Sequence, residues 1–112
     1  MSKHLLVKRI ERIRKHKYIL QKIAEAKPSK RKKMLSKAPN MLFTVIKDLC
    51  ILMDNGLLDM KYPNRHSETV QQVAKRNLGA IKGMVKQKGG VIGSIIAAAV
   101  PFLVPLLSKI FK

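Results

Sequence analysis

Residues 89–108 read GGVIGSIIAAAVPFLVPLLS, twenty residues without a charged side chain. A run of this length is long enough to cross a bilayer once as a helix. Its ten strongly apolar residues favour insertion, whereas Gly93, Ser94, Pro101 and Pro105 oppose it. Two alternatives follow: the segment inserts into or disrupts a membrane, or it is buried in a protein partner or in the protein's own bundle. We favour membrane activity, because so long an apolar run is rarely left exposed in a soluble monomer.

The two halves of this segment are expected to differ in direction. Gly89-Gly90 predicts a hinge, and Pro101 and Pro105 predict a kinked hydrophobic helix, divided into an arm over 91–100 and a stub to 111. Gly89, Gly93 and Ala97 form a small-residue ridge suited to helix association. The residues expected to contact a bilayer are Val91, Ile92, Ile95, Ile96, Val100, Phe102, Leu103, Leu106 and Leu107.

Nearly all of the positive charge precedes this segment in the sequence, and only Lys109 and Lys112 follow it. The 112-residue chain holds 24 Lys and Arg against 6 Asp and Glu, a formal net charge of +18, although 46% of it is hydrophobic. Residues 1–37 carry 14 of the basic residues and residues 73–88 carry five more, the latter without an acid. The high apolar fraction argues against a wholly disordered basic tail, and the excess positive charge indicates a polyanionic partner, either nucleic acid or an anionic membrane.

Non-specific binding to double-stranded DNA is the expected use of residues 1–37 and of the basic neck over 73–88. Aromatic residues make up 4% of the chain and Trp is absent, so base-stacking platforms for single strands are not expected. Contacts of Lys and Arg with phosphate are independent of sequence. The candidate DNA-binding residues are Lys8, Arg9, Arg12, Arg14, Lys15, Lys30, Arg31, Lys32 and Lys33.

Apolar periodicity predicts an all-α fold, a small bundle of about four helices, two of them basic and amphipathic. We expect helices over 2–26, 29–37, 39–55 and 67–88, arranged around the third, with an extended connector over 57–66. Asn55-Gly56 would end the third helix, with Gly56 free to take a positive φ. The organisation predicted is a basic front with an apolar helix over 1–66, a basic neck over 67–88 and a hydrophobic tail over 89–112.

The N-terminus does not have the pattern of a signal peptide, because Lys and Arg interrupt its first thirty residues. We therefore expect a protein made and kept in the cytosol or nucleus. Lys30 to Lys33 would serve either as a nuclear address or as a solvated helix face.

Catalytic chemistry is not expected. His4, His16, His66 and Cys50 lack the spacing of metal ligands, and no glycine loop precedes a helix in the manner of a phosphate site. Cys50 stands among apolar neighbours, which predicts a buried thiol. Among the acids, Asp48 with Lys47 is expected on a solvated face, and Asp54 and Asp59 in a turn or cap. No enzyme activity, metal or cofactor is predicted.

The order of several short motifs resembles a known family. Residues 26–39 read AKPSKRKKMLSKAP, and Asn55-Gly56, a Lys-rich neck and Gln87-Lys88-Gly89-Gly90 follow before the apolar end. From Tyr18 onward the chain resembles small basic proteins of Polinton/Maverick elements and their adintovirus and adomavirus relatives, and the tail is similar to the small basic core protein of adenoviruses. The resemblance implies a core or minor capsid protein, with possible cleavage at Gly89-Gly90.

Four functions are consistent with these features. The first is a virion protein that neutralises packaged DNA, and the second is a membrane-active entry factor whose effector is the tail; the two roles can coexist. The third is a cationic membrane-lytic peptide of the leaderless bacteriocin type. The fourth is a capsid cement whose tail is buried in a coat protein. Residence in the virion, with passage through the host nucleus or cytoplasm and contact with a host membrane, is the expected localisation.

Overall fold

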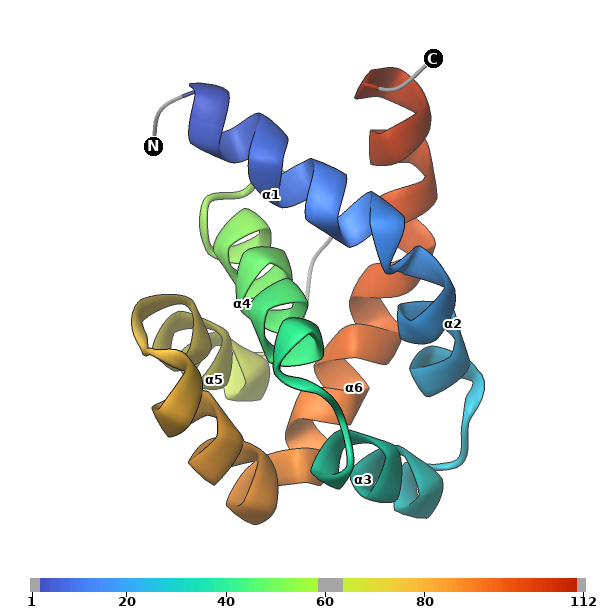
Figure 1. Ribbon diagram of the computed structural model, residues 1–112, viewed down its shortest axis with the longest axis vertical. Coiled ribbons are helices and arrows are strands. Elements are labelled where there is room, and N and C mark those ends of the chain that lie inside the picture. Colours follow the sequence, from blue (N-terminus) through green and yellow to red (C-terminus); the bar gives the residue numbers. More distant parts are fainter. Residues whose placement is uncertain (1–2, 59–63, 111–112) are drawn as a thin grey trace.

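The computed structural model describes residues 3–58 and 64–110, which form six helices and no strand (Figure 1). The helices are α1 (Lys3–Lys15), α2 (Lys17–Glu25), α3 (Pro28–Ser36), α4 (Asn40–Asp54), α5 (Asn64–Lys75) and α6 (Leu78–Ile110). The predicted all-α class is confirmed. The arrangement differs from the expected four helices and separate tail helix in two ways. Two of the predicted helices are each divided in two, and the second part of the last one is continuous with the tail in α6. Half of the connector expected over 57–66, residues 59–63, lies outside the described residues. The prediction is wrong for residues 64–66, which belong to α5.

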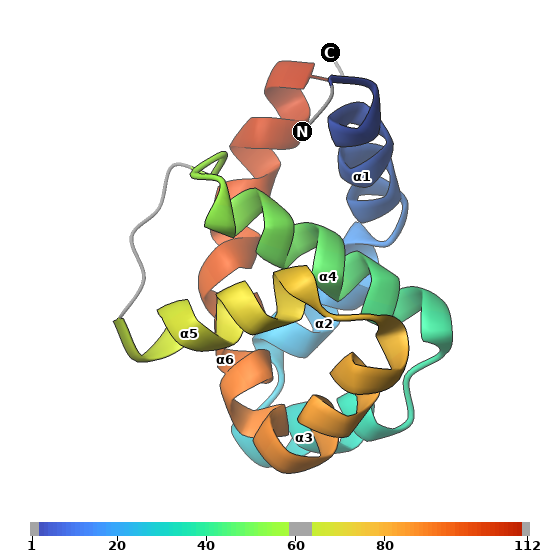
Figure 2. The same ribbon diagram turned by 90° about the vertical axis from the view of Figure 1, so that its left-hand side faces the viewer.

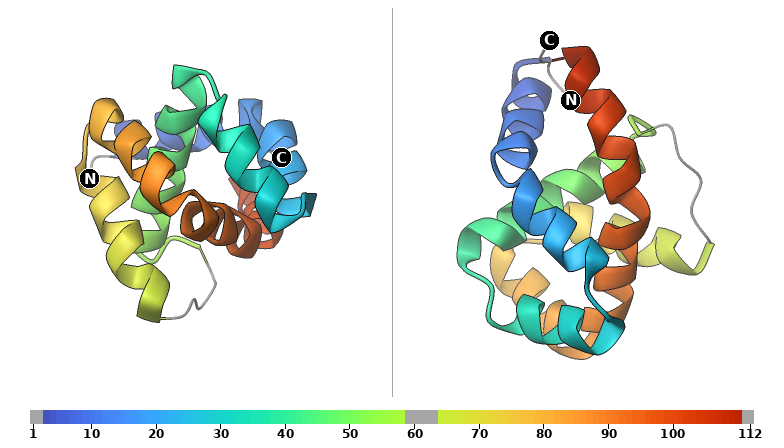
Figure 3. Two further views of the ribbon diagram at one scale, coloured as in Figure 1. Left: turned by 90° about the horizontal axis from the view of Figure 1, so that it is seen from below. Right: turned by 90° about the vertical axis from the view of Figure 1, so that its right-hand side faces the viewer.

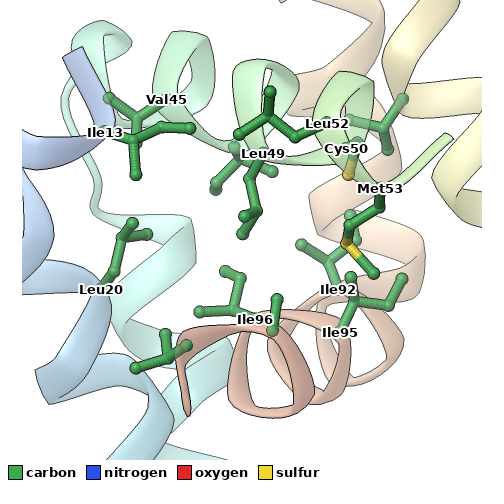
Figure 4. Close-up of a cluster of buried hydrophobic side chains, with 14 of the residues drawn as sticks. Ile13, Leu20, Val45, Leu49, Cys50, Leu52, Met53, Ile92, Ile95 and Ile96 are labelled. Carbon is green, nitrogen blue, oxygen red and sulfur yellow. The ribbon is translucent and has the colours of Figure 1, made fainter. Parts of the chain in front are cut away.

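The first division falls at His16, within the helix expected over 2–26. His16 has φ −111° and ψ 14°, and its backbone N–H still donates to the carbonyl oxygens of Arg12 and Ile13. The bend allows α1 to pack on α4, whereas α2 packs on α6. Figure 4 shows the effect of the bend: Ile13 of α1 lies beside Val45 of α4. Leu20 of α2 lies on the side of the core that faces Ile96 of α6.

The second division falls between Lys75 and Leu78, within the helix expected over 67–88. The backbone N–H of Ala80 donates to Oδ1 of Asn77 at 2.9 Å, so Asn77 caps the first turn of α6. The cap begins a new helix where the apolar pattern alone predicts a continuous one. Asn55-Gly56 ends α4 as predicted, with Gly56 at φ 68°.

Helix α6 runs for 33 residues and continues through Pro101 and Pro105, so the predicted break into two arms is wrong. Both prolines lie on the exposed side of the helix, where water can bond the carbonyl groups that lose an N–H partner. The opposite side is buried, and its packing holds the helix together. The one non-helical residue inside α6 is Lys88, with φ −124° and ψ 28°, immediately before the Gly89-Gly90 pair.

The apolar segment forms the interior of the bundle. Helices α2, α3, α4 and α5 all pack on α6 (Figures 2 and 3), so α6 shares the central place that was expected for the third helix. Leu49, Leu52 and Met53 of α4 face the isoleucines of α6 across the core (Figure 4). Each fully buried Ile or Leu contributes about 1.5–3 kcal/mol relative to an exposed one. The fully buried members from α6 include Ile92, Ile95, Ile96 and Leu103.

Two glycines allow α3 to approach α6 closely. A Cβ at Gly89 would lie 3.2 Å from Cγ of Lys32, and a Cβ at Gly93 would lie 3.1 Å from Cβ of Arg31. The predicted small-residue ridge is therefore used within the chain, where it lets the backbone of α6 lie against α3.

Candidate nucleic-acid interface

The nine Lys and Arg residues predicted to bind DNA occupy three different environments. Arg9, Arg12 and Arg31 make hydrogen bonds inside the fold. Lys8, Arg14 and Lys15 are exposed on α1. The third group, Lys30, Lys32 and Lys33, is exposed on α3.

Arg9 and Arg12 of α1 bind one carboxylate of α4. Nη1 of Arg9 donates to Oδ1 of Asp48 at 2.8 Å, and Arg12 donates from Nε to Oδ2 at 2.8 Å and from Nη2 to Oδ1 at 3.1 Å. The Asp48 side chain is fully buried, so the prediction of a solvated face is wrong. Asp48 lies three residues after Val45 and four before Leu52, on the apolar side of α4, and burial there requires cationic partners.

Arg31 of α3 caps the end of α2. Its Nε donates to the carbonyl oxygen of Ile23 at 3.1 Å and its Nη2 donates to that of Ala24 at 2.8 Å. These carbonyls belong to the last turn of α2, where the helix dipole favours a cation. The Arg31 guanidinium is therefore hydrogen-bonded within the fold. The aliphatic part of the Arg31 side chain packs over Gly93 of α6.

The exposed lysines of α3 lie beside lysines of α6. Since α3 packs on the first half of α6, the two sets meet at one end of the bundle, at the bottom of Figure 1. Lys32 contacts the position of Gly89, and Lys82 and Lys86 border a shallow depression that Leu35, Ser36 and Ala38 also line. We name this surface the basic pole. Its exposed members are Lys27, Lys30, Lys32, Lys33, Lys37, Lys82, Lys86 and Lys88.

No acidic residue belongs to the two segments that build the basic pole. The sequence has no Asp or Glu between Glu25 and Asp48, and none after Glu68. The lysines have no carboxylate in their own segments, so their positive potentials add. One acid from outside these segments, Glu25 of α2, lines a depression together with Lys30. Lys82 is placed over the ring of Phe43, with Nζ 5.9 Å from the ring centroid, which orients one of these cations.

Five members of the basic pole lie within the segments predicted to bind DNA, 1–37 and 73–88, but were not named as candidate residues: Lys27, Lys37, Lys82, Lys86 and Lys88. The absence of acids from residues 26–47 and 69–112 is a sequence signal that could have found them. That the two segments lie side by side follows from the packing of α3 on α6, which the sequence pattern does not reveal.

The basic residues on α1 form a separate and less cationic group. Nζ of Lys15 lies 3.8 Å from Oε1 of Glu11. This exposed pair reduces the local positive potential, although such pairs contribute little to stability. The α1 group lies away from the basic pole, toward the opposite end of the bundle (Figure 1).

Most residues predicted to contact a bilayer are buried in the protein itself. Val91 and Phe102 are exposed and Leu106 is half-buried. The six buried residues are Ile92, Ile95, Ile96, Val100, Leu103 and Leu107. By length and composition, α6 is nevertheless a candidate membrane span over Leu78–Ser108, with 44% of its most apolar window buried.

The predicted cleavage position, Gly89-Gly90, lies inside α6. Gly89 is buried against Lys32 and Gly90 is exposed. Access of a protease to this bond would require local unwinding of α6, beginning at the non-helical residue Lys88.

Cys50 is a buried thiol, as predicted. It is 2% exposed, and burial raises the pKa of the thiol to about 12, with the Asp54 carboxylate adding to the increase. At neutral pH the sulfur is a protonated, unreactive core group. Within residues 3–58 and 64–110 no group of three His, Cys, Asp or Glu side chains is placed to hold a metal ion.

Comparison with protein-family models, with curated proteins and with solved structures finds no match to this chain.

Proposed function

We propose that this protein is a non-enzymatic, virion-associated basic protein that binds double-stranded DNA without sequence specificity through the basic pole. The observation that carries the proposal is the packing of α3, which carries or adjoins five exposed lysines, on the first half of α6, which carries three more, with no acid in either segment. Exposed lysines contact phosphates as point charges and release counterions from the duplex.

The salt dependence of binding tests this proposal. The logarithm of the binding constant falls with the logarithm of salt concentration by about 0.9 per phosphate neutralised, so eight engaged lysines predict a slope of about −7. Replacement of Lys30, Lys32 and Lys33 by Gln should make the slope less steep by about 3 and weaken binding to random duplexes. Electrophoretic mobility shifts or fluorescence anisotropy over a salt series measure both quantities.

A charge-matched control separates the basic pole from a general effect of net charge. Lys8, Lys15 and Lys75 are exposed outside the basic pole, and their replacement by Gln removes the same three charges. We expect this control to keep the slope of the unaltered protein. Equal loss in the two triple variants would refute the basic pole as the interface, and a salt-independent affinity would refute phosphate binding altogether.

The virion assignment is supported by the resemblance of the chain from Tyr18 onward to small basic proteins of Polinton/Maverick elements and their adintovirus and adomavirus relatives. It places the protein with packaged DNA in the particle, in contact with capsid protein, after assembly in the host nucleus or cytoplasm. Mass spectrometry of nuclease-treated, purified particles tests it. Recovery of the protein in stoichiometric amount is expected, and its absence from particles would contradict the assignment.

A second candidate function is membrane insertion of α6, supported by the length and apolar composition of Leu78–Ser108. Insertion would require the bundle to open, because Ile92, Ile95 and Ile96 are buried. We propose that flexing at Gly89-Gly90, beside the non-helical Lys88, would allow this opening. Dye leakage from anionic vesicles is the expected result with the full chain, and intact vesicles at saturating protein would refute membrane disruption.

A further inference from the structure

The side of α6 that is turned away from the core is apolar and uncharged over its second half. Val91, Phe102 and Val104 are 37%, 39% and 45% exposed, and no charged residue occurs between Lys88 and Lys109. We name this surface the outward face of α6. Its exposed or half-buried members are Gly90, Val91, Ser94, Ala97, Ala98, Pro101, Phe102, Val104, Pro105, Leu106 and Ser108.

Other helices of the bundle have charged residues on their solvent-exposed sides, as is usual for a soluble protein. The exposed sides of α1 and α3 carry charged residues, such as Lys8 and Lys15 on α1 and Lys32 and Lys33 on α3. An outer helix face without charge over some twenty residues is unusual for a monomer, and it marks a contact with a partner or a membrane. The outward face of α6 is therefore a docking surface that the fold leaves uncovered.

The charges around this face identify its occupant. Exposed Lys82, Lys86 and Lys88 stand on α6 before it, and Lys109 and Lys112 follow it in the sequence. When a helix lies in the plane of a bilayer, lysines at its two ends reach anionic headgroups, and the apolar side chains between them enter the boundary of the acyl layer. A second copy would bring together two chains of net charge +18, which repel each other. One acid, Glu25 of α2, borders the depression beside Val104.

We propose that the folded protein docks on an anionic phospholipid bilayer through the outward face of α6, with the bundle intact. The inward side of the same helix holds Ile92, Ile95 and Ile96 in the core, so docking requires no unfolding. The inference shares with the second candidate function only the anionic bilayer as partner, and it is an alternative to insertion: α6 lies along the surface of the bilayer and does not cross it.

Two double variants of similar exposure test the docking surface. The first replaces Phe102 and Val104 by Ser on the outward face. The control replaces Leu5 and Val7 by Ser on α1, where the side chains are 47% and 41% exposed. The full chain is sedimented with vesicles of phosphatidylcholine containing a minority of phosphatidylglycerol, and with phosphatidylcholine alone. Thermal unfolding and DNA binding confirm that both variants are folded.

We expect binding to the anionic vesicles and little to the neutral ones. The outward-face variant should bind the anionic vesicles about tenfold more weakly, because it loses apolar contact, and the α1 variant should bind as the unaltered protein does. Equal affinities for the two variants would overturn the docking surface alone. Failure of the unaltered protein to bind either vesicle would overturn the membrane association itself.

Cys50 reports whether the bundle stays closed. It is the one cysteine of the chain and is 2% exposed, so a maleimide reacts with it only when the core opens. We expect vesicle-bound protein to be as protected as free protein. Rapid labelling on vesicles would overturn docking of the folded bundle in favour of insertion. A dimer of free protein that is lost in the Phe102 and Val104 variant would overturn the lipid as occupant in favour of a second copy.

Discussion

Arg12 of α1 donates two hydrogen bonds to Asp48 of α4, from Nε to Oδ2 at 2.8 Å and from Nη2 to Oδ1 at 3.1 Å. Thirty-six residues separate the two in sequence. Arg9 adds a third hydrogen bond to the same carboxylate. The arrangement links α1 to the core through one buried acid, so two of the cations predicted to bind DNA stabilise the fold instead.

Replacement of Asp48 by Ala should destabilise the protein by about 3 kcal/mol. Loss of one partner of a buried ion pair costs about 3–5 kcal/mol, and the lower end applies because the Arg12 side chain is 40% exposed and can regain water. Urea unfolding followed by circular dichroism measures the change. Asp54→Ala is the control at an exposed acid of the same helix, with an expected change within about 0.5 kcal/mol. Equal losses in the two variants would contradict the role of Asp48.

The elements that sequence analysis located correctly are those with a strong local signal. The apolar residues of α4 and the pair Asn55-Gly56 define a helix and its end by spacing and backbone freedom, which are local properties. The break between α1 and α2 at His16 could not be predicted, because Ile13 and Leu20 are seven residues apart, a spacing that a continuous helix also satisfies. The start of α6 had a local signal, the Asn77 cap, that the apolar pattern obscured.

The surroundings of single side chains depended on tertiary packing. The position of Asp48 on the apolar side of α4 was readable from its spacing to Val45 and Leu52, but its partners Arg9 and Arg12 were not. The twenty uncharged residues fit a membrane span and a core helix equally well by composition. Only the surrounding amphipathic helices, whose apolar sides need a partner, show that α6 fills the core of this bundle.

Replacement of Arg31 by Ala should cost about 1–2 kcal/mol. Two carbonyl oxygens at the end of α2 lose a charged donor, and hydrogen bonds to charged groups contribute about 1.5–3 kcal/mol when they are well shielded. Lys30→Ala, at an exposed neighbouring position of α3, removes the same charge and should leave stability within about 0.5 kcal/mol. Thermal unfolding of both variants measures the difference, and a neutral Arg31→Ala would show that water replaces the cap.

Replacement of Gly93 by Leu should destabilise the protein by about 1–3 kcal/mol, the usual cost of overpacking. Even a Cβ there would lie 3.1 Å and 3.2 Å from Cβ and Cδ of Arg31, so the larger side chain must push α3 away from α6. Gly90→Leu is the matched control, because nothing lies within 4 Å of a Cβ at Gly90. There the better helix propensity of Leu should stabilise α6 by about 0.5–1 kcal/mol. Opposite signs in denaturant unfolding are expected, and the same sign would contradict close packing at Gly93.

Cys50 should make stability fall as the pH rises above about 9. Burial raises the pKa of the thiol from 9.0 to about 12, so between these values the unfolded chain carries a thiolate while the folded chain keeps its proton. The unfolded state then binds fewer protons, and the free energy of unfolding decreases by up to about 1.4 kcal/mol per pH unit. Below pH 9 both states hold the proton and the effect vanishes.

Cys50→Val removes the thiol titration while filling the site, so the difference in unfolding free energy between the two proteins isolates the contribution of the thiol. A difference that stays constant from pH 8 to pH 10.5, where both proteins would be measured at about half-unit steps, would contradict a thiol kept neutral by the core.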